Sequence, residues 1–207
     1  MSDLPITRYG ARVAAGWMMD HFGPAISAAV ENKPYRRRHI CAIACQETAY
    51  KWLSWIGHYE PATIIERCVF DASGDAPDTH RTAFPRNTAA FRARYGDALT
   101  DMLIEEANLT RRLQNWSDRP WVYKGYGIFQ YDLQSIGDDP DFFKNRMWYD
   151  FGACLNRCTQ ELDSKLASHG GDLWAAVKAY NGSGPAAENY MQNVKIFAEE
   201  CGTVTGD

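Results

Sequence analysis

The chain has 207 residues, of which 45% are hydrophobic and 13% aromatic, enough for one domain with a substantial core. Its formal net charge of -4 lacks the basic excess that phosphate contacts require, so nucleic acid is not an expected partner. No basic segment followed by an apolar run opens the chain, and no apolar stretch reaches membrane-spanning length. We therefore expect one domain over 1–207, made in the cytoplasm without a signal peptide and with no membrane partner.

Helical periodicity dominates the chain, and strand-like alternation is scarce, so the expected class is mainly α. The pattern predicts a first helix at 11–30 that breaks at Gly23-Pro24, and a second at 36–57. The segment 57–85, rich in Asp, Gly and Pro, is typical of an irregular surface loop.

The second half of the chain continues the helical pattern. Residues 86–116 predict two helices separated near Gly96 and Asp97, with Asp97 as the cap of the longer one. After an aromatic, glycine-bearing stretch, the segment 140–168 is helical again. Helix boundaries are then expected at the following positions: an N-terminal cap at Asp172, an end at Asn181-Gly182, and a new start at Pro185.

The six cysteines are Cys41, Cys45, Cys68, Cys154, Cys158 and Cys201. The first two are four residues apart, as are the fourth and fifth, so on helices each pair shares one face, where cysteine acts as a small hydrophobe. Core packing is the favoured interpretation in a chain without an export signal. Disulfides are the alternative if the protein is delivered outside the cell. A zinc site is disfavoured, because its usual spacing has two intervening residues and no histidine sits beside either pair.

One carboxylate stands in an apolar context. In "CAIACQETAY", Glu47 continues the stripe of Ile40, Ile43 and Ala44 at helical spacing, which places it toward the interior. Burial raises the pKa of a carboxyl group unless cations or donors compensate. A carboxyl group that keeps its proton near neutral pH is suited to protonating a departing glycosidic oxygen. The alternative is a structural Glu that pairs with an arginine or caps a helix.

Two motifs favour the catalytic interpretation. The stretch "GYGIFQYD" combines glycines that allow close backbone approach, aromatic Tyr126 and Phe129 for stacking on sugars, and the polar Gln130 and Asp132. In "AYNGSGP", Tyr180 and Asn181 end a helix and can direct a hydroxyl and an amide into a cleft.

In the order Glu-bearing helix, G-Y-G-I-F-Q and A-Y-N-G, the chain resembles the lysozyme-like family that includes soluble lytic transglycosylases and goose-type lysozymes. The resemblance implies a mainly α lysozyme-like fold and a role for each matching residue. Glu47 matches the general acid, and Thr48 supplies the neighbouring hydroxyl. Gln130 is implied to contact the substrate, with Tyr180 and Asn181 closing the site; Asp132 takes the place of an Asp that holds the hydrolytic water in goose-type members.

The chain also departs from the family pattern. The matched motifs leave 57–124 as a long insertion after the catalytic helix, and Trp121 stands where goose-type enzymes have a further Asp. The identity of the second catalytic carboxylate therefore stays undecided. Asp132 is the first candidate, and the alternatives brought by the insertion are Glu60, Asp71, Asp75 and Asp78. Without such a base, the family offers a route in which the substrate's N-acetyl group assists and an anhydro product forms. The presence of Asp132 favours hydrolysis.

The resemblance implies a β-1,4-linked amino-sugar polymer as substrate, with peptidoglycan expected first and chitin as the alternative. Four aromatic residues are expected in the cleft: Trp121, Tyr123, Tyr126 and Phe129. The basic run 36–38 is expected to be solvated, although it could also meet anionic peptide stems. We expect a monomer that needs no cofactor or metal.

Such an enzyme would reach the wall after lysis or by non-classical delivery. Two other classes stay open: a catalytically silent sugar-binding module, and a helical protein-interaction domain without a cleft. The first is disfavoured because pure binding gains little from a costly buried acid. The second would be favoured if Glu47, Gln130 and Tyr180 lay far apart.

Overall fold

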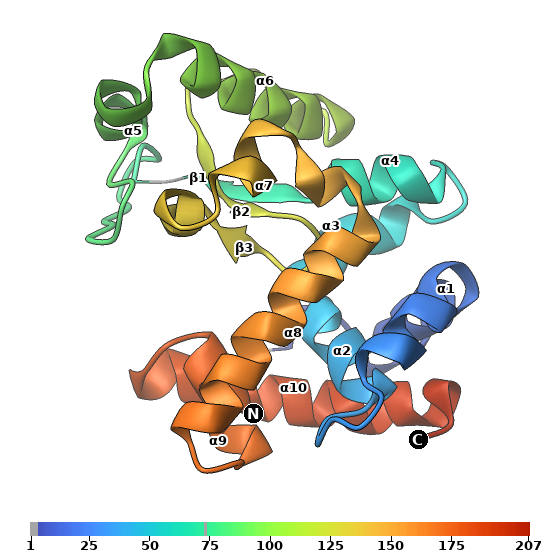
Figure 1. Ribbon diagram of the computed structural model, residues 1–207. Coiled ribbons are helices and arrows are strands. Elements are labelled where there is room, and N and C mark those ends of the chain that lie inside the picture. The colour runs from blue at the N-terminus through green and yellow to red at the C-terminus, as the bar shows by residue number, and fades with distance from the viewer. Residues whose placement is uncertain (1–3, 73) are drawn as a thin grey trace. The chain divides into compact units, whose positions relative to one another are not determined.

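The computed structural model of the protein describes residues 4–72 and 74–207 and is mainly helical, with one small antiparallel sheet (Figure 1). The chain divides into two compact units, and the expectation of one domain over 1–207 stays a prediction. Unit 1 comprises Met1–Pro61 with Leu155–Asp207, and unit 2 comprises Ala62–Cys154. Among the described residues, none of the helices combines the length and the apolar character needed to cross a bilayer.

Unit 1 is built from helices. They are α1 (Arg8–Ala29), α2 (Arg37–Ala44), the π-helical turn η1 (Cys45–Ala49), α3 (Tyr50–Trp52), the 3-10 turn η2 (Leu53–Trp55), α9 (Leu173–Tyr180) and α10 (Gly184–Thr205). Helix α8 (Phe151–Ser168) begins in unit 2 and ends in unit 1. Helices α1, α2 and α10 all pack against one another and form the core of unit 1 (Figure 1).

Small side chains allow this close packing. Helix α2 buries two isoleucines, two alanines and Cys41, and α1 meets it with a row of fully buried alanines. Helix α1 continues through Pro24, so the predicted break at Gly23-Pro24 is wrong. The proline removes one backbone donor, but the helix beyond it buries Ile26 completely, and this packing offsets the local cost.

The cysteines pack in these cores. All six are buried and not disulfide-bonded, which agrees with the core-packing interpretation. The sulfur atoms of Cys45 and Cys201 lie 4.0 Å apart, a packing contact between unbonded thiols. Burial raises the pKa of the Cys41 and Cys68 thiols, as it does for structural rather than reactive cysteines.

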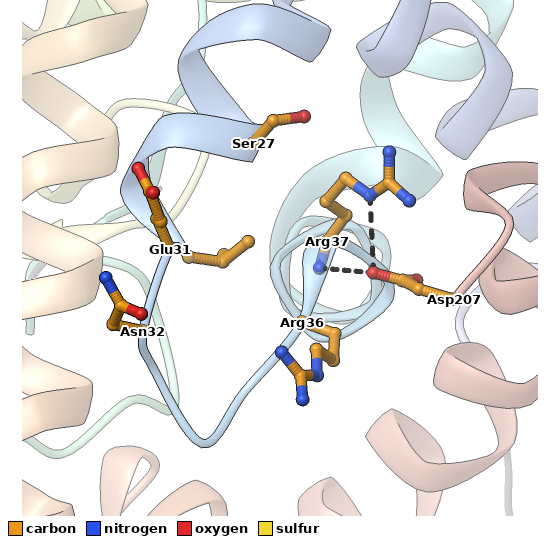
Figure 2. Close-up of a pocket in the computed structure, with 7 residues that line it drawn as sticks. Ser27, Glu31, Asn32, Arg36, Arg37 and Asp207 are labelled. Carbon is orange, nitrogen blue, oxygen red and sulfur yellow. Dashed lines mark hydrogen bonds and ion pairs between the residues drawn. The ribbon is translucent and has the colours of Figure 1, made fainter.

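The N-terminus of α2 is capped from the other end of the chain (Figure 2). Arg36 at the cap position supplies no side-chain hydrogen bond, and the Asp207 carboxylate takes over that role. It accepts hydrogen bonds from the backbone N–H of Arg37 at 3.0 Å and of Arg38 at 3.3 Å. Burial by itself raises the pKa of Asp207, but hydrogen bonds from Thr205, Arg37 and Arg38 outweigh it and leave the pKa below its usual value.

Unit 2 combines helices with the sheet. Its elements are α4 (Pro61–Glu66), β1 (Val69–Ala72), α5 (Thr88–Tyr95), α6 (Asp97–Leu113), β2 (Tyr123–Tyr126), β3 (Tyr131–Asp132), the 3-10 turns η3 (Leu133–Gly137) and η4 (Met147–Tyr149), and α7 (Pro140–Lys144). The strand order is β1-β2-β3 with both pairs antiparallel. Gly125 in the central strand is the partner of Phe70 on one side and of Asp132 on the other.

The structure corrects two expectations in this unit. The segment 57–85 is not simply a loop, because it contains α4 and β1. Strand β1 depends on pairing with β2, about fifty residues later, a contact that local patterns do not reveal. The predicted division of 86–116 at Gly96 is confirmed, whereas Asp97 begins α6 and Gly96 holds the cap position.

Candidate active site

Glu47 lies in the π-helical turn η1, which follows α2 directly. The three other members of its predicted stripe, Ile40, Ile43 and Ala44, are fully buried as expected, but Glu47 itself is half-buried. A π-helical turn is wider than an α-helical one and changes the direction of the side chains within it. Such turns are frequent at functional sites. Glu47 thus follows a buried helix, while the residue itself is only partly buried.

Two tyrosines accompany this carboxyl group. Tyr190 of α10 donates a hydrogen bond of 2.6 Å from its hydroxyl to Glu47 Oε1. Tyr180, the last residue of α9, stacks against Tyr190 with ring centroids 6.3 Å apart and an interplanar angle of 18°. Three separate elements of unit 1 therefore bring Glu47, Tyr180 and Tyr190 together.

Both phenols are held in their protonated form. Burial, then the Glu47 charge and the neighbouring Tyr180, raise the pKa of Tyr190 well above its ordinary value. Burial, then Cys158 and Glu47, do the same for the pKa of Tyr180. At neutral pH Tyr190 is consequently a hydrogen-bond donor to the carboxyl group and does not compete with it as a second anion.

Thr48 has a structural position. Its side chain is fully buried, accepts a hydrogen bond of 2.9 Å from Trp52 Nε1, and lies 3.5 Å from the carbonyl oxygen of Ala44, to which it donates. Trp52 is also fully buried and packs on Trp17 with ring centroids 5.0 Å apart. The expected contact of Thr48 with substrate is therefore corrected: its hydroxyl fixes the turn that carries Glu47.

Asn181 follows Tyr180 at the C-terminal cap of α9, and its side chain is exposed. The cap at the other end of this helix is Asp172, which accepts hydrogen bonds from the backbone N–H of Trp174 and Ala175, as predicted. The A-Y-N stretch is thus presented at the end of a capped helix, with Tyr180 turned inward and Asn181 open to solvent.

The second motif, in unit 2, forms a β-hairpin. Strands β2 and β3 are joined by 127–130, and Gln130 has a positive φ of 56°. Its amide Nε2 donates to the carbonyl oxygen of Gly127 at 2.8 Å, so part of its hydrogen-bonding capacity is used within the turn. Gly127 has a φ of 77°, and a Cβ there would lie 2.4 Å from the sulfur of Cys154. Gly127 is therefore required by the turn itself.

Three of the four aromatic residues expected in the cleft are core residues instead. Tyr123, Tyr126 and Phe129 are only 4%, 1% and 2% exposed. Tyr126 packs edge-on against Trp148, with ring centroids 4.8 Å apart, and Phe129 contacts Phe151. Their assignment as sugar platforms is therefore corrected, because an aromatic residue in a tight hairpin also supplies the apolar area that a small sheet must bury. Trp121 is half-buried beneath the guanidinium of Arg119.

Asp132 stabilises this hairpin through hydrogen bonds. Its Oδ1 accepts a hydrogen bond of 2.6 Å from Arg81 and one of 2.8 Å from the backbone N–H of Gln134, which caps η3. Arg81 also donates to the carbonyl oxygens of Phe84 and Pro85. The carboxylate expected to position water is therefore paired with the Arg81 guanidinium and serves as the N-terminal cap of η3.

The alternative carboxylates differ in surroundings. Asp75 Oδ2 accepts hydrogen bonds from the backbone N–H and the hydroxyl of Thr88, so it anchors the start of α5. Asp71 lies 3.6 Å from the ammonium of Lys124. Glu60 and Asp78 are exposed. Within the described part of the chain, no group of three or more potential ligands could hold a metal ion.

Glu106 is a buried carboxylate with a purely structural network of partners. It is 3% exposed and receives hydrogen bonds from Arg67 at 3.1 Å, Arg146 at 2.6 Å and the Tyr149 hydroxyl at 2.6 Å. This network offsets the cost of burying its charge. Sequence reasoning did not single out Glu106, although the alternative interpretation given for Glu47 describes it well.

Sequence reasoning also missed Tyr190, Trp52 and Arg81. Tyr190 follows Ala187 and precedes Met191 and Val194 on the buried face of α10. A hydroxyl-bearing ring within an apolar stripe was the available signal, the counterpart of the carboxylate within the stripe of α2. Trp52 and Arg81 offered no comparable pattern, because their roles depend on contacts formed only in the fold.

No protein-family model matches the chain, and neither a curated protein nor a solved structure matches it significantly.

Proposed function

We propose that the protein cleaves β-1,4 glycosidic bonds of an amino-sugar polymer, with peptidoglycan as the first expected substrate and Glu47 as the general acid. The observation that carries the proposal is the hydrogen bond of 2.6 Å from Tyr190 to Glu47 Oε1, on a half-buried carboxyl group in a π-helical turn. It supports an acid held in a defined position rather than a solvated surface charge.

In this proposal the Tyr190 hydroxyl holds the Glu47 carboxyl group through Oε1 while that group gives its proton to the glycosidic oxygen. Once the proton has been given up, the donated hydrogen bond stabilises the resulting carboxylate. Tyr180, next to Tyr190 and close enough for the Glu47 charge to affect its pKa, matches the Tyr that the family resemblance places beside the catalytic acid.

A second route for the same cleavage is favoured by the surroundings of Asp132. A hydrolase of the inverting type needs a second carboxylate to activate water. Asp132 already pairs with Arg81 and caps η3. A reaction that uses the substrate's own N-acetyl and 6-hydroxyl groups, and forms an anhydro sugar, needs no second carboxylate from this chain. Lytic transglycosylation is therefore the second candidate function.

Mass spectrometry of released products tests both candidates. The full chain is incubated with purified peptidoglycan and, separately, with chitin oligomers. Products with ordinary reducing ends are expected for hydrolysis, and products lighter by one water for the anhydro-forming route. Retention of the protein on the polymer without any released product would contradict the proposal and favour a sugar-binding module.

A further inference from the structure

Cys158 on α8 is a buried thiol beside the Glu47 site. It is 2% exposed and lies in the part of α8 that belongs to unit 1, together with Glu47, Tyr180 and Tyr190. The Tyr180 hydroxyl is hydrogen-bonded to this thiol. Because a phenol O–H is a stronger donor than a thiol S–H, Tyr180 donates and Cys158 Sγ accepts. The single proton of the Tyr180 hydroxyl is therefore used in a bond to α8.

Tyr180 is nevertheless close to the Glu47 carboxyl group. Its ring stacks on Tyr190 with centroids 6.3 Å apart and an interplanar angle of 18°, and Tyr190 donates to Glu47 Oε1 at 2.6 Å. Burial, then Cys158 and Glu47, raise the pKa of Tyr180, so the Glu47 carboxylate lies within electrostatic reach of its hydroxyl. Two stacked phenols thus approach one carboxyl group, but they donate to different acceptors.

Other titratable groups lie around the Cys158 thiol. Glu161, on the next turn of α8, also contributes to raising the pKa of Tyr180. Asp163 accepts a hydrogen bond of 2.9 Å from the Tyr35 hydroxyl. Burial, followed by this hydrogen bond, raises the pKa of Tyr35, with a smaller contribution from Cys158. Tyr35 therefore already has a carboxylate acceptor, and Tyr180 is the phenol that donates to Cys158.

We propose that Cys158 is a positioning residue that directs the Tyr180 hydroxyl away from the Glu47 carboxyl group. Glu47 then receives a phenol hydrogen bond from Tyr190 and not a second one from Tyr180. The thiol acts through Tyr180 and has no contact with the substrate in this proposal.

The number of donors matters for a general acid. Each hydrogen bond to an ionised carboxyl group favours the ionised form, so a second phenol donor would make Glu47 lose its proton at lower pH. An acid catalyst must still hold that proton when the substrate is bound. The inference rests on the function proposed for Glu47, but the effect of Cys158 on the carboxyl group can be measured without catalysis.

Nuclear magnetic resonance on the full chain labelled with ¹³C-glutamate tests the proposal. The side-chain carboxyl signal of Glu47, assigned with Glu47→Gln, is followed through a pH titration. Cys158→Ala frees the Tyr180 hydroxyl to donate to Glu47, and the midpoint of the titration should fall by about one pH unit, the scale of one hydrogen bond to a charged group. Cys158→Ser keeps an acceptor for Tyr180 and should stay close to the wild-type midpoint.

Further variants separate this role from a loss of packing. Adding Tyr180→Phe to Cys158→Ala removes the freed hydroxyl and should return the midpoint to the wild-type value. Cys68→Ala removes a fully buried thiol from unit 2 and should leave the midpoint unchanged. Cys158→Val fills the space without accepting a hydrogen bond, so it should match Cys158→Ala and replaces it if that variant does not fold.

Three results would overturn the proposal: an unchanged midpoint in the folded Cys158 variants that lack an acceptor, a fall that persists in the double variant, or an equal fall in Cys68→Ala. The titration needs no substrate, so these results would leave the function proposed for Glu47 untouched. A lack of glycan cleavage by the wild type would contradict that function instead, and the titration would still report on Cys158.

Discussion

The hydroxyl of Tyr190 on α10 lies 2.6 Å from Oε1 of Glu47, to which it donates a hydrogen bond across 143 residues of sequence. This pair joins the π-helical turn after α2 to the long C-terminal helix, two elements that pack directly on each other. The position of the Glu47 carboxyl group thus depends on a contact with the protein core, and its chemistry should respond to changes in that contact.

Tyr190→Phe keeps the ring and removes the donor to Glu47. We expect kcat/KM on a soluble glycan substrate to fall about tenfold, the usual scale for one hydrogen bond to a charged group. The donor favours the ionised carboxyl group, so its loss should move the basic limb of the pH-rate profile to higher pH. Tyr9→Phe changes a phenol that is 69% exposed and serves as the control. An unchanged profile in Tyr190→Phe would contradict the coupling.

Trp52→Phe tests the anchoring of the π-helical turn. The change removes the indole donor to Thr48 and leaves a buried hydroxyl without one partner. The expected cost is about 2 kcal/mol of unfolding free energy, from the lost hydrogen bond and the smaller ring. Activity should fall while the variant is still folded, because the turn that carries Glu47 loses its anchor. Trp116→Phe, at a ring that is 44% exposed, should leave both quantities close to wild type.

His39 predicts a specific pH dependence of stability. Its pKa is about 4 in the fold and about 6.5 in the unfolded chain, so between these values the unfolded state binds more protons. The contribution is fully present above about pH 6.5 and is lost as pH falls toward 4, at up to about 1.4 kcal/mol per pH unit. Urea unfolding at several pH values measures this slope. His39→Asn, which keeps an acceptor for the Arg36 N–H, should flatten it, whereas His58→Gln at an exposed position should not.

Asp132→Asn distinguishes the two reaction routes. If Asp132 positions water, the variant should lose on the order of 10²-fold in rate. The surroundings of Asp132 predict a smaller change in rate, together with a loss of about 1 kcal/mol in stability from the weakened pairing with Arg81 and the weakened cap of η3. Rate and unfolding free energy measured on the same preparation decide between these outcomes.

Much of the fold could be predicted because helices are encoded locally. The helix ending at Tyr180, its cap at Asp172 and the division at Gly96 all follow from short-range patterns, and the structure confirms them. Strand β1 could not be predicted, since it exists through pairing with β2 far along the chain. The continuation of α1 through Pro24 is likewise a tertiary effect that overrides a local signal.

The site was predictable where an unusual residue stood in a regular pattern. Glu47 in an apolar stripe and Tyr180 at a helix end were both recognisable, and the structure brings them close. Tyr190 was not, because a tyrosine on a buried face is ordinary until its hydroxyl is seen to meet a carboxyl group. The aromatic residues of the hairpin were misassigned because composition alone does not distinguish a core ring such as Tyr126 from a binding platform.

The most direct test is the rate at which the wild type, Glu47→Gln and Glu31→Gln release soluble products from purified peptidoglycan. Co-sedimentation of each protein with the same polymer serves as the binding control. Glu31 is exposed, so its change matches the charge lost at Glu47 without touching the site. We expect Glu47→Gln to lose on the order of 10²-fold or more in rate while it still pellets, and Glu31→Gln to resemble the wild type. Near-normal release by Glu47→Gln would contradict the role of Glu47 as the general acid.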